Sequence, residues 1–283
     1  MKRKAIIISI KGYQLTLKEK NLLAFEKPWG LILFKRNVKS LVQIKKLIKK
    51  IRKITKDKKF PIMIDEEGGK VSRLNKIMNH SVTQKKFGEL YETDSKLALT
   101  IYKNYINNLT KFLKNVGINI NTVPVLDIPS QDESGVIGDR AYSNDKAIII
   151  QMGEIVLNEN RLNGVGSVIK HVPGHGKATV DSHFDLPIIT DEKVVLENND
   201  FIPFETLNCA PLAMTAHAVY EKIDKNNVAT LSKIMIEEII KNKIGFKGTL
   251  MTDDISMKAL SGDIATNSFL ALQAGCDLVL HCN

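Results

Sequence analysis

The protein has 283 residues, of which 43% are hydrophobic and 25% charged, with 17 glycines and 8 prolines. This is ordinary globular composition, and it excludes a disordered or collagen-like chain. A total of 41 lysines and arginines against 31 acidic residues gives a net charge of +10, which taken alone suggests an anionic partner.

The amino-terminal residues and the cysteines bear on where the protein works. The basic start MKRK is followed by only six apolar-leaning residues, too few for a signal-peptide core. No stretch approaches the roughly 18 apolar residues that a membrane helix needs. Cys209, Cys276 and Cys282 form no CxxC pair and argue against a disulfide framework. We therefore expect a soluble protein of the reducing cytoplasm.

Eight short apolar runs recur along the chain. Most are nearly continuous isoleucine, leucine, valine and methionine, which is typical of strands buried on both faces. The runs are Ala5–Ile10, Gly30–Phe34, Phe60–Ile64, Ile118–Val123, Gly166–Ile169, Pro211–Met214, Gly248–Met251 and Asp277–Leu280.

Helical periodicity fills the stretches between these runs. Apolar residues repeat at i, i+3, i+4 and i+7 from Ile44 to Ile54 and from Leu97 to Leu109, and the second stretch lies between the capping residues Asp94 and Gly117. Alternating strands and helices predict a parallel sheet, and eight strands in this length predict a single (β/α)8 barrel spanning residues 1–283. Because the eighth run almost reaches Asn283, we expect this barrel to lack its last outer helix.

Polar and ionisable residues follow five of the runs, as expected for an active site at the carboxyl ends of barrel strands. Asp65 and Arg73 follow the third run, Lys170 and His171 the fifth, and Asp253 the seventh. Five of the six histidines lie at or after such ends: His171, His175, His183, His217 and His281.

Two groups of residues fit acid–base and nucleophilic chemistry. Asp181 and His183 are two residues apart, so the carboxylate could orient the imidazole and raise its pKa, although the spacing also fits a loop-bracing hydrogen bond. Asp253 could attack an electrophilic carbon. Adjacent acids cannot share one pocket, so either Asp253 or Asp254 should brace the other or cap a helix that begins at Ile255.

Basic residues offer donors and a charged surface. Lys170, Arg73 and Arg140 are candidate donors to substrate hydroxyls or carboxylates. The segment 45–59 holds nine basic residues and one acid. It could bind nucleic acid or a membrane surface, but we favour the solvated face of an outer barrel helix.

Several stretches resemble the bacterial β-N-acetylhexosaminidases of glycoside hydrolase family 3. The pattern KH-x-PGHG-x4-DSH (170–183), followed by TDD-x-SM (252–257), is the most specific. The other stretches are GLILFKRN (30–37), IDEEGGKVSR (64–73), NTVPVLDI (121–128), IGDRAYSND (137–145), MTAHAVY (214–220) and AGCDLVLHCN (274–283).

The resemblance implies a retaining enzyme that removes terminal β-1,4-linked N-acetylglucosamine from 1,6-anhydro-N-acetylmuramic acid muropeptides during peptidoglycan recycling, without a metal or organic cofactor. Asp253 would be the nucleophile, and His183 the acid/base held by Asp181. The residues that the resemblance assigns to sugar binding are Asp65, Arg73, Arg140, Lys170 and His171.

Three alternatives remain open at this stage. His171, His175, Asp181 and His183 could instead hold Zn²⁺ in a metal-dependent hydrolase. Phosphate could replace water as the acceptor, since a neutral histidine repels anions less than a carboxylate does. A non-catalytic basic binding protein is the third alternative. We expect a monomer that acts on a small muropeptide, with no nucleic-acid or membrane partner.

Overall fold

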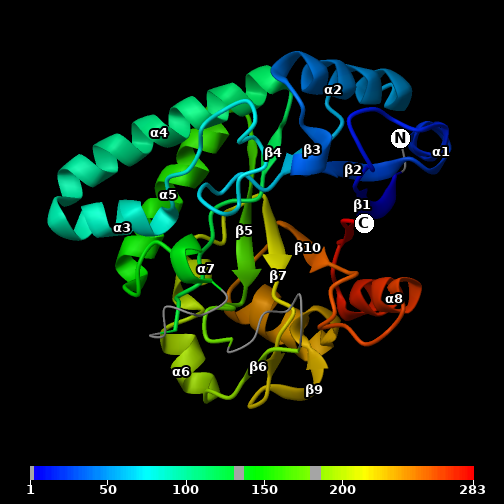
Figure 1. The fold of residues 1–283 in the computed structure, drawn as a ribbon. Coiled ribbons are helices and arrows are strands. Elements are labelled where there is room, and N and C mark those ends of the chain that lie inside the picture. The colour runs from blue at the N-terminus through cyan, green and yellow to red at the C-terminus, as the bar shows by residue number, and fades with distance from the viewer. Residues whose placement is uncertain (1–2, 131–136, 179–185) are drawn as a thin grey trace.

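The computed structural model describes residues 3–130, 137–178 and 186–283 (Figure 1). Eight parallel strands close a barrel in the order β1-β11-β10-β7-β5-β4-β3-β2. The strands are β1 (Lys4–Ile8), β2 (Pro28–Leu33), β3 (Ile62–Ile64), β4 (Ile120–Asn121), β5 (Gly166–Val172), β7 (Leu212–Thr215), β10 (Thr249–Asp254) and β11 (Leu278–His281).

The predicted (β/α)8 barrel is confirmed, and each of the eight apolar runs contains at least half of one barrel strand. The barrel closes because β1 pairs with both β2 and β11, with Ile7 opposite Gly30 on one side and Leu280 on the other. β11 is followed only by Cys282 and Asn283, so no outer helix comes after it within the 283 residues.

Helices surround the barrel on the outside (Figure 1). The α-helices are α1 (Leu17–Asn21), α2 (Leu41–Thr55), α3 (Gln84–Thr93), α4 (Ser95–Val116), α5 (Lys146–Asn163), α6 (Lys193–Asn198), α7 (Ile202–Thr206) and α8 (Ile264–Ala274). The π-helices are η1 (Leu22–Glu26) and η5 (Ile234–Lys243), and the 3-10 turns are η2 (Lys35–Asn37), η3 (Gly138–Arg140) and η4 (Ala229–Leu231). A small sheet, β6 (Ile188–Ile189), β8 (Val219–Tyr220) and β9 (Asp224–Val228), lies outside the barrel.

The two predicted helices are confirmed, the second with both of its predicted caps. In α4 the Asp94 carboxylate accepts a hydrogen bond of 3.0 Å from the Leu97 amide, and Gly117 ends the helix in the left-handed conformation. In α2 the Ile44, Leu47, Ile48 and Ile51 side chains are buried. No helix among the described residues is long and apolar enough to cross a membrane.

The prediction of a helix beginning at Ile255 is wrong. Strand β10 continues to Asp254, and the Asp254 carboxylate then accepts hydrogen bonds from the Ser256 amide and hydroxyl in a turn. The next helix, α8, begins only at Ile264, where Asp263 is its N-cap.

The core has two layers, as strands buried on both faces require. One apolar cluster fills the barrel interior; its buried members are Ile7, Ile32, Met63, Ile120, Val168, Leu212, Met214, Met251, Leu278 and Leu280. A larger cluster packs the outward strand residues, such as Ile62, Ile64 and Leu250, with the inner faces of helices. Because neighbours along a strand point to opposite faces, this inner cluster fixes which later residues face the barrel mouth.

Candidate active site

Four polar residues lie two positions beyond a residue of the barrel interior. Asp65 follows Met63, Thr122 follows Ile120, Lys170 follows Val168 and Asp253 follows Met251. The two-residue period of a strand carries the first three to the inward face at the carboxyl end of the barrel. For Asp253 the period is not sufficient, because the pairing of β10 with β11 shifts register between Met251 and Asp254. Contacts among the first three side chains agree with this placement.

Asp65 lies among hydrogen-bond donors. Its carboxylate pairs with Arg73 at 3.2 Å and with the Lys170 Nζ at 3.4 Å, and it accepts a hydrogen bond from the Thr122 hydroxyl. Burial opposes ionisation of Asp65, but the two cations and the hydroxyl outweigh it and hold its pKa well below the ordinary value. Asp65 is therefore an ionised hydrogen-bond acceptor at neutral pH.

Glu66 shapes the loop that carries Arg73. Its buried carboxylate accepts hydrogen bonds from the amides of Arg73 and Leu74 at 2.8 and 2.9 Å and from the Ser72 hydroxyl at 2.6 Å. His80 contacts the same carboxylate through Nδ1. Glu66 is therefore engaged within its own loop, and it holds the backbone at Arg73 where that side chain reaches Asp65.

Glu67 holds two cations together. Its carboxylate meets the Arg140 guanidinium at two points, 2.8 and 2.9 Å, and lies 2.6 Å from the Lys170 Nζ. Burial opposes its ionisation, but Arg140 and Lys170 prevail and lower the pKa of Glu67 to about 2. The same arrangement raises the pKa of Arg140 above its ordinary value, against the effect of burial, so the Arg140–Glu67 pair is ionised at neutral pH.

Asp127 organises the loop after β5. Its buried carboxylate contacts the His171 Nδ1 at 2.7 Å and accepts a 2.7 Å hydrogen bond from the His175 amide. The other ring nitrogen of His171, Nε2, lies 3.5 Å from Arg140. Burial first, and then the neighbouring His171, lower the pKa of His175 to about 4, so His175 is neutral at neutral pH.

Asp253 and Asp254 have different surroundings. The Asp254 carboxylate accepts hydrogen bonds from the Ser256 hydroxyl at 2.8 Å and the Cys282 amide at 3.1 Å. Within the described ranges, the only hydrogen-bond donor to the Asp253 carboxylate is the Asp254 amide, at 2.7 Å. Asp254 thus braces the end of β10, whereas Asp253 keeps acceptor capacity toward the barrel mouth.

His217 lies beside the end of β10 and contacts its backbone. Its Nδ1 lies 2.7 Å from the Thr230 hydroxyl and its Nε2 lies 3.0 Å from the Asp254 carbonyl oxygen. Burial lowers the pKa of His217, against the opposing charge of Asp253. With both ring nitrogens engaged, His217 positions the end of β10.

The structure brings five of the eight predicted site residues into one connected network: Asp65, Arg73, Arg140, Lys170 and His171. Asp253 faces the same mouth, and its charge acts on His175 and His217. Asp181 and His183 lie outside the described residues. Sequence reasoning assigned no role to Glu67, Thr122 or Asp127, although the two-residue period after Ile120 could have identified Thr122.

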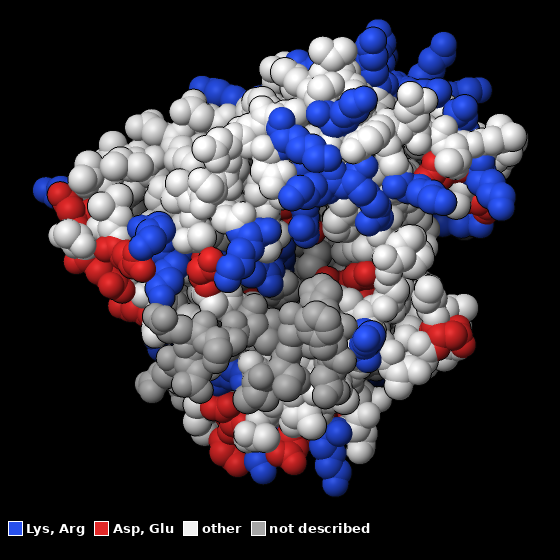
Figure 2. All heavy atoms as spheres, in the orientation of Figure 1, with Lys and Arg blue, Asp and Glu red and all other residues white. Residues whose placement is uncertain are grey.

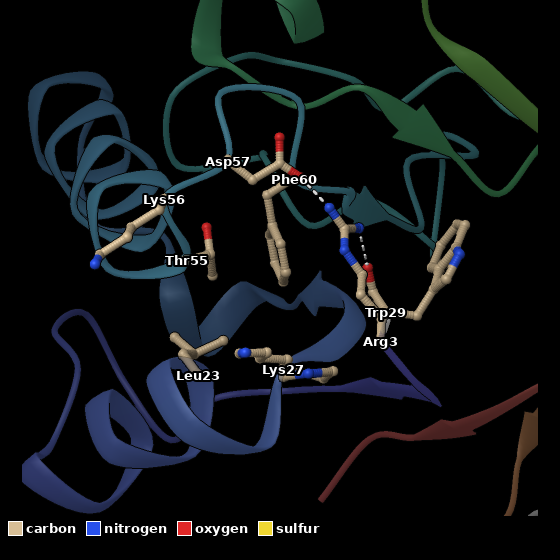
Figure 3. Close-up of a pocket in the computed structure, with 9 residues that line it drawn as sticks. Arg3, Leu23, Lys27, Trp29, Thr55, Lys56, Asp57 and Phe60 are labelled. Carbon is tan, nitrogen blue, oxygen red and sulfur yellow. Dashed lines mark hydrogen bonds and ion pairs between the residues drawn. The ribbon is translucent and has the colours of Figure 1, made fainter. Parts of the chain in front are cut away.

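Two other features of the molecule bear on the location and type of site. The hollow in Figure 3, of about 580 Å³, is lined by Trp29, Phe60 and the residues around them at the start of β2, so it lies at the opposite end of the barrel from the Asp65 network. In the part of the chain that the structure describes, no three histidine, cysteine, aspartate or glutamate side chains are placed to hold a metal ion.

Comparisons with known proteins agree with the fold and identify its relatives. The family described as "Glycosyl hydrolase family 3 N terminal domain" matches residues 7–283. A β-hexosaminidase of Mannheimia succiniciproducens is 34% identical over 98% of this chain and 80% of its own length. One of Hydrogenovibrio crunogenus is 33% identical over 98% of this chain and 78% of its own.

Solved structures give the same result. NagZ from Neisseria gonorrhoeae, in complex with N-trifluoroacetyl-D-glucosamine, has a TM-score of 0.89 at 30% identity, covering 99% of this chain and 82% of that one. A family 3 β-N-acetylglucosaminidase from Paenibacillus has a TM-score of 0.89 at 26% identity, covering 98% of this chain and 53% of that one.

Proposed function

The chain belongs to glycoside hydrolase family 3, and on that premise we propose that it is a retaining exo-β-N-acetylglucosaminidase in which Asp253 is the nucleophile. Residues 1–283 would form its catalytic barrel as one domain. The observation that supports the proposal best is the Asp253 carboxylate at the carboxyl end of β10, whose charge acts on His175 and His217 and which accepts a single hydrogen bond among the described residues.

The substrate class rests on the relatives and on the donors in the mouth. The related NagZ was solved with an N-acylated glucosamine, and the curated relatives are named β-hexosaminidases. Arg73, Arg140 and Lys170 offer N–H donors to sugar hydroxyls or the acetamido oxygen, and the ionised Asp65 accepts from hydroxyls. We place His171 beside them in the sugar site, where its Nε2 lies 3.5 Å from Arg140. Mixed donors and acceptors of this kind suit a neutral amino sugar.

In the proposed reaction, a carboxylate oxygen of Asp253 forms a bond to the anomeric carbon as the glycosidic C–O bond breaks. His183, oriented by Asp181, gives a proton to the departing oxygen. In the second step His183 accepts a proton from water while the water oxygen bonds to the anomeric carbon and releases Asp253. Two inversions leave the β-configuration unchanged.

The cellular role is also a proposal. We infer that the natural substrates are muropeptides carrying 1,6-anhydro-N-acetylmuramic acid, cleaved by a monomer in the cytoplasm during peptidoglycan recycling. Support comes from the similarity to NagZ and from three free cysteines, which suit a reducing compartment.

Product analysis tests this function. Wild-type protein incubated with an N-acetylglucosaminyl-anhydromuramyl-peptide should release N-acetylglucosamine, first as the β-anomer. Release of the α-anomer would contradict a retaining mechanism, and no release in the presence of activity on a simple aryl glycoside would contradict the muropeptide assignment.

Two further experiments separate the alternatives. Adding phosphate distinguishes hydrolysis, which yields free sugar, from phosphorolysis, which yields the sugar 1-phosphate. Dialysis against a chelator distinguishes the metal-dependent alternative, in which activity should disappear and return with zinc. We expect free sugar as the product and no effect of the chelator.

A further inference from the structure

The positive charge of the protein is concentrated in its first fifth. Residues 11–59 contain 16 lysines and arginines and three acids, a net charge of +13 against +10 for the whole chain. Residues 60–283 contain 22 basic and 28 acidic residues, a net charge of −6. Lys and Arg side chains gather over the part of the surface where α1 and α2 lie (Figures 1 and 2).

The three acids of this segment are already engaged. Glu19 accepts hydrogen bonds from the Lys11 and Thr16 amides at 2.7 and 2.6 Å and so caps α1. Glu26 pairs with Lys4, and Asp57 pairs with Arg3. Exposed lysines of α2, by contrast, have no carboxylate within ion-pair distance anywhere in the described chain; they are Lys46, Lys49, Lys50 and Lys53.

Large apolar side chains are also exposed in this basic segment. Leu17 is 71% exposed and Phe25 76% exposed on the helical stretch α1–η1, and Val42 is 63% exposed on α2. Tyr13 and Leu22 add further exposed apolar surface to the same segment. Burying such side chains would be favourable, so their exposure beside unpaired cations points to a partner.

The two helical elements form one face of the molecule. The α1–η1 stretch packs against α2, and Leu23 of η1 and Thr55 of α2 line the same hollow (Figure 3). At the other end of α2, the Gln43 side chain donates a 2.8 Å hydrogen bond to the Tyr13 carbonyl oxygen. We call this surface, formed by residues 13–27 and 41–56, the basic–apolar face.

We propose that the basic–apolar face binds the surface of an anionic phospholipid bilayer, with Leu17 and Phe25 entering the interface and the lysines of α2 contacting lipid phosphates. Mixed basic and apolar side chains on a surface helix match the two layers that a bilayer interface offers. This departs from the sequence-based expectation that the protein has no membrane partner.

Nucleic acid is the less suitable partner for this face. A polyanion would pair with the lysines, and Phe25 and Tyr13 offer rings on which bases can stack, but Leu17, Leu22 and Val42 would stay in water because aliphatic side chains offer no stacking surface. Lys27 and Lys56 of the face also line the hollow at its edge (Figure 3). Arg3, which lines the same hollow, is paired with Asp57. Neither lysine pairs with a carboxylate of the described residues, so a lipid headgroup phosphate fits this rim.

Vesicle sedimentation tests the proposal. The full chain should sediment with phosphatidylcholine vesicles that contain phosphatidylglycerol, and much less with pure phosphatidylcholine, and added salt should release it. Combined substitution of Lys46, Lys49 and Lys53 by glutamine should weaken binding by about a hundredfold. The double variant Leu17→Ser with Phe25→Ser should weaken it by about tenfold or more.

Matched variants on other surfaces are the controls. Leu162→Ser with Phe269→Ser removes two side chains that are 71% and 60% exposed elsewhere. The triple glutamine variant of Lys222, Lys225 and Lys233 removes three exposed lysines outside the face. All variants should keep the unfolding midpoint of the wild type, since their side chains are exposed.

Three results would overturn the proposal. They are equal binding to anionic and neutral vesicles, unchanged binding of both face variants, and preferential binding of duplex DNA over anionic vesicles at matched salt. The enzymatic proposal is independent of all three, because the basic–apolar face contains no residue of the candidate active site.

Discussion

Arg140 and Glu67 form a two-point ion pair in which Nε and Nη2 of the guanidinium lie 2.8 and 2.9 Å from the two carboxylate oxygens. Lys170 approaches the same carboxylate to 2.6 Å. Glu67 therefore fixes the spacing of two cations that we propose to contact the sugar. It acts as a positioning residue rather than as a group that touches substrate.

Glu67→Gln should lower kcat/KM by about tenfold to a hundredfold. Glutamine keeps the size of the side chain but removes the charge that holds Arg140 and Lys170, so both cations gain alternative positions. Steady-state kinetics on an aryl N-acetyl-β-glucosaminide measure the effect. Glu89→Gln, which removes an acid paired with Lys86 on the surface, is the control. Equal kinetics for the two variants would contradict the positioning role.

Acid unfolding should reveal the Glu67 pair. The pKa of Glu67 is about 2 in the folded protein against an ordinary value of 4.5, so the folded-state pKa is the lower one. The pair stabilises the fold fully above pH 4.5 and contributes progressively less as the pH falls toward 2. Over this pH range the free energy of unfolding of the wild type, measured with urea, should fall by about 3 kcal/mol because of this group. Glu67→Gln should not show this part of the loss. If the free energies of unfolding of wild type and Glu67→Gln changed in parallel with pH, this prediction would be wrong.

Lys170→Met should destabilise the protein and impair catalysis together. Lys170 is only 2% exposed and lies between the Asp65 and Glu67 carboxylates. Its removal leaves two buried acids without their shared cation, which costs about 3–5 kcal/mol in comparable buried pairs. Thermal and urea unfolding measure the loss. Replacement of both acids as well, in Lys170→Met with Asp65→Asn and Glu67→Gln, should recover part of the stability but not the activity.

Gly176→Ala should disturb the loop that carries His175. A Cβ atom at Gly176 would lie 1.7 Å from the Ile128 carbonyl oxygen, so the loop must move away from the segment that contains Asp127. We expect kcat/KM to fall by about tenfold or more, because small misplacements at a site are costly. At Gly12 a Cβ would meet nothing within 4 Å, so Gly12→Ala should behave as wild type. An active Gly176→Ala enzyme with wild-type kinetics would show that the loop tolerates the shift.

The sequence was sufficient for the barrel because buried parallel strands are nearly continuous apolar runs. It also placed Asp65, Lys170 and Asp253 at the carboxyl ends of strands, since each follows such a run, but their roles in binding or catalysis stay predictions. The sequence could not separate the roles of Glu66 and Glu67. Two adjacent acids look alike until the structure shows which residues each side chain contacts.

Other site contacts join distant segments. Asp127 contacts His171, 44 positions away in the sequence, and Arg140 contacts Glu67, 73 positions away, separations that no local pattern encodes.

The helix wrongly predicted at Ile255 has a physical cause as well. Asp254 resembles an N-cap in sequence, but its carboxylate instead holds a turn and the Cys282 amide, which lets β10 run to the barrel mouth.

The identity of the nucleophile is the central claim, and Asp253→Ala gives a first indication. Its rate should fall by about a thousandfold or more, with loss of the burst of aryl leaving group. Asp254→Asn should keep a measurable burst while losing stability, because the Asp254 carboxylate braces the end of β10.

The most direct measurement is mass spectrometry of the wild-type enzyme, acid-quenched during turnover of an aryl N-acetyl-β-glucosaminide and digested with a protease. We predict one N-acetylglucosaminyl adduct, which fragmentation places on Asp253 and which Asp253→Ala lacks. An adduct on any other residue, or full-rate hydrolysis by Asp253→Ala, would contradict the assignment of Asp253 as the nucleophile.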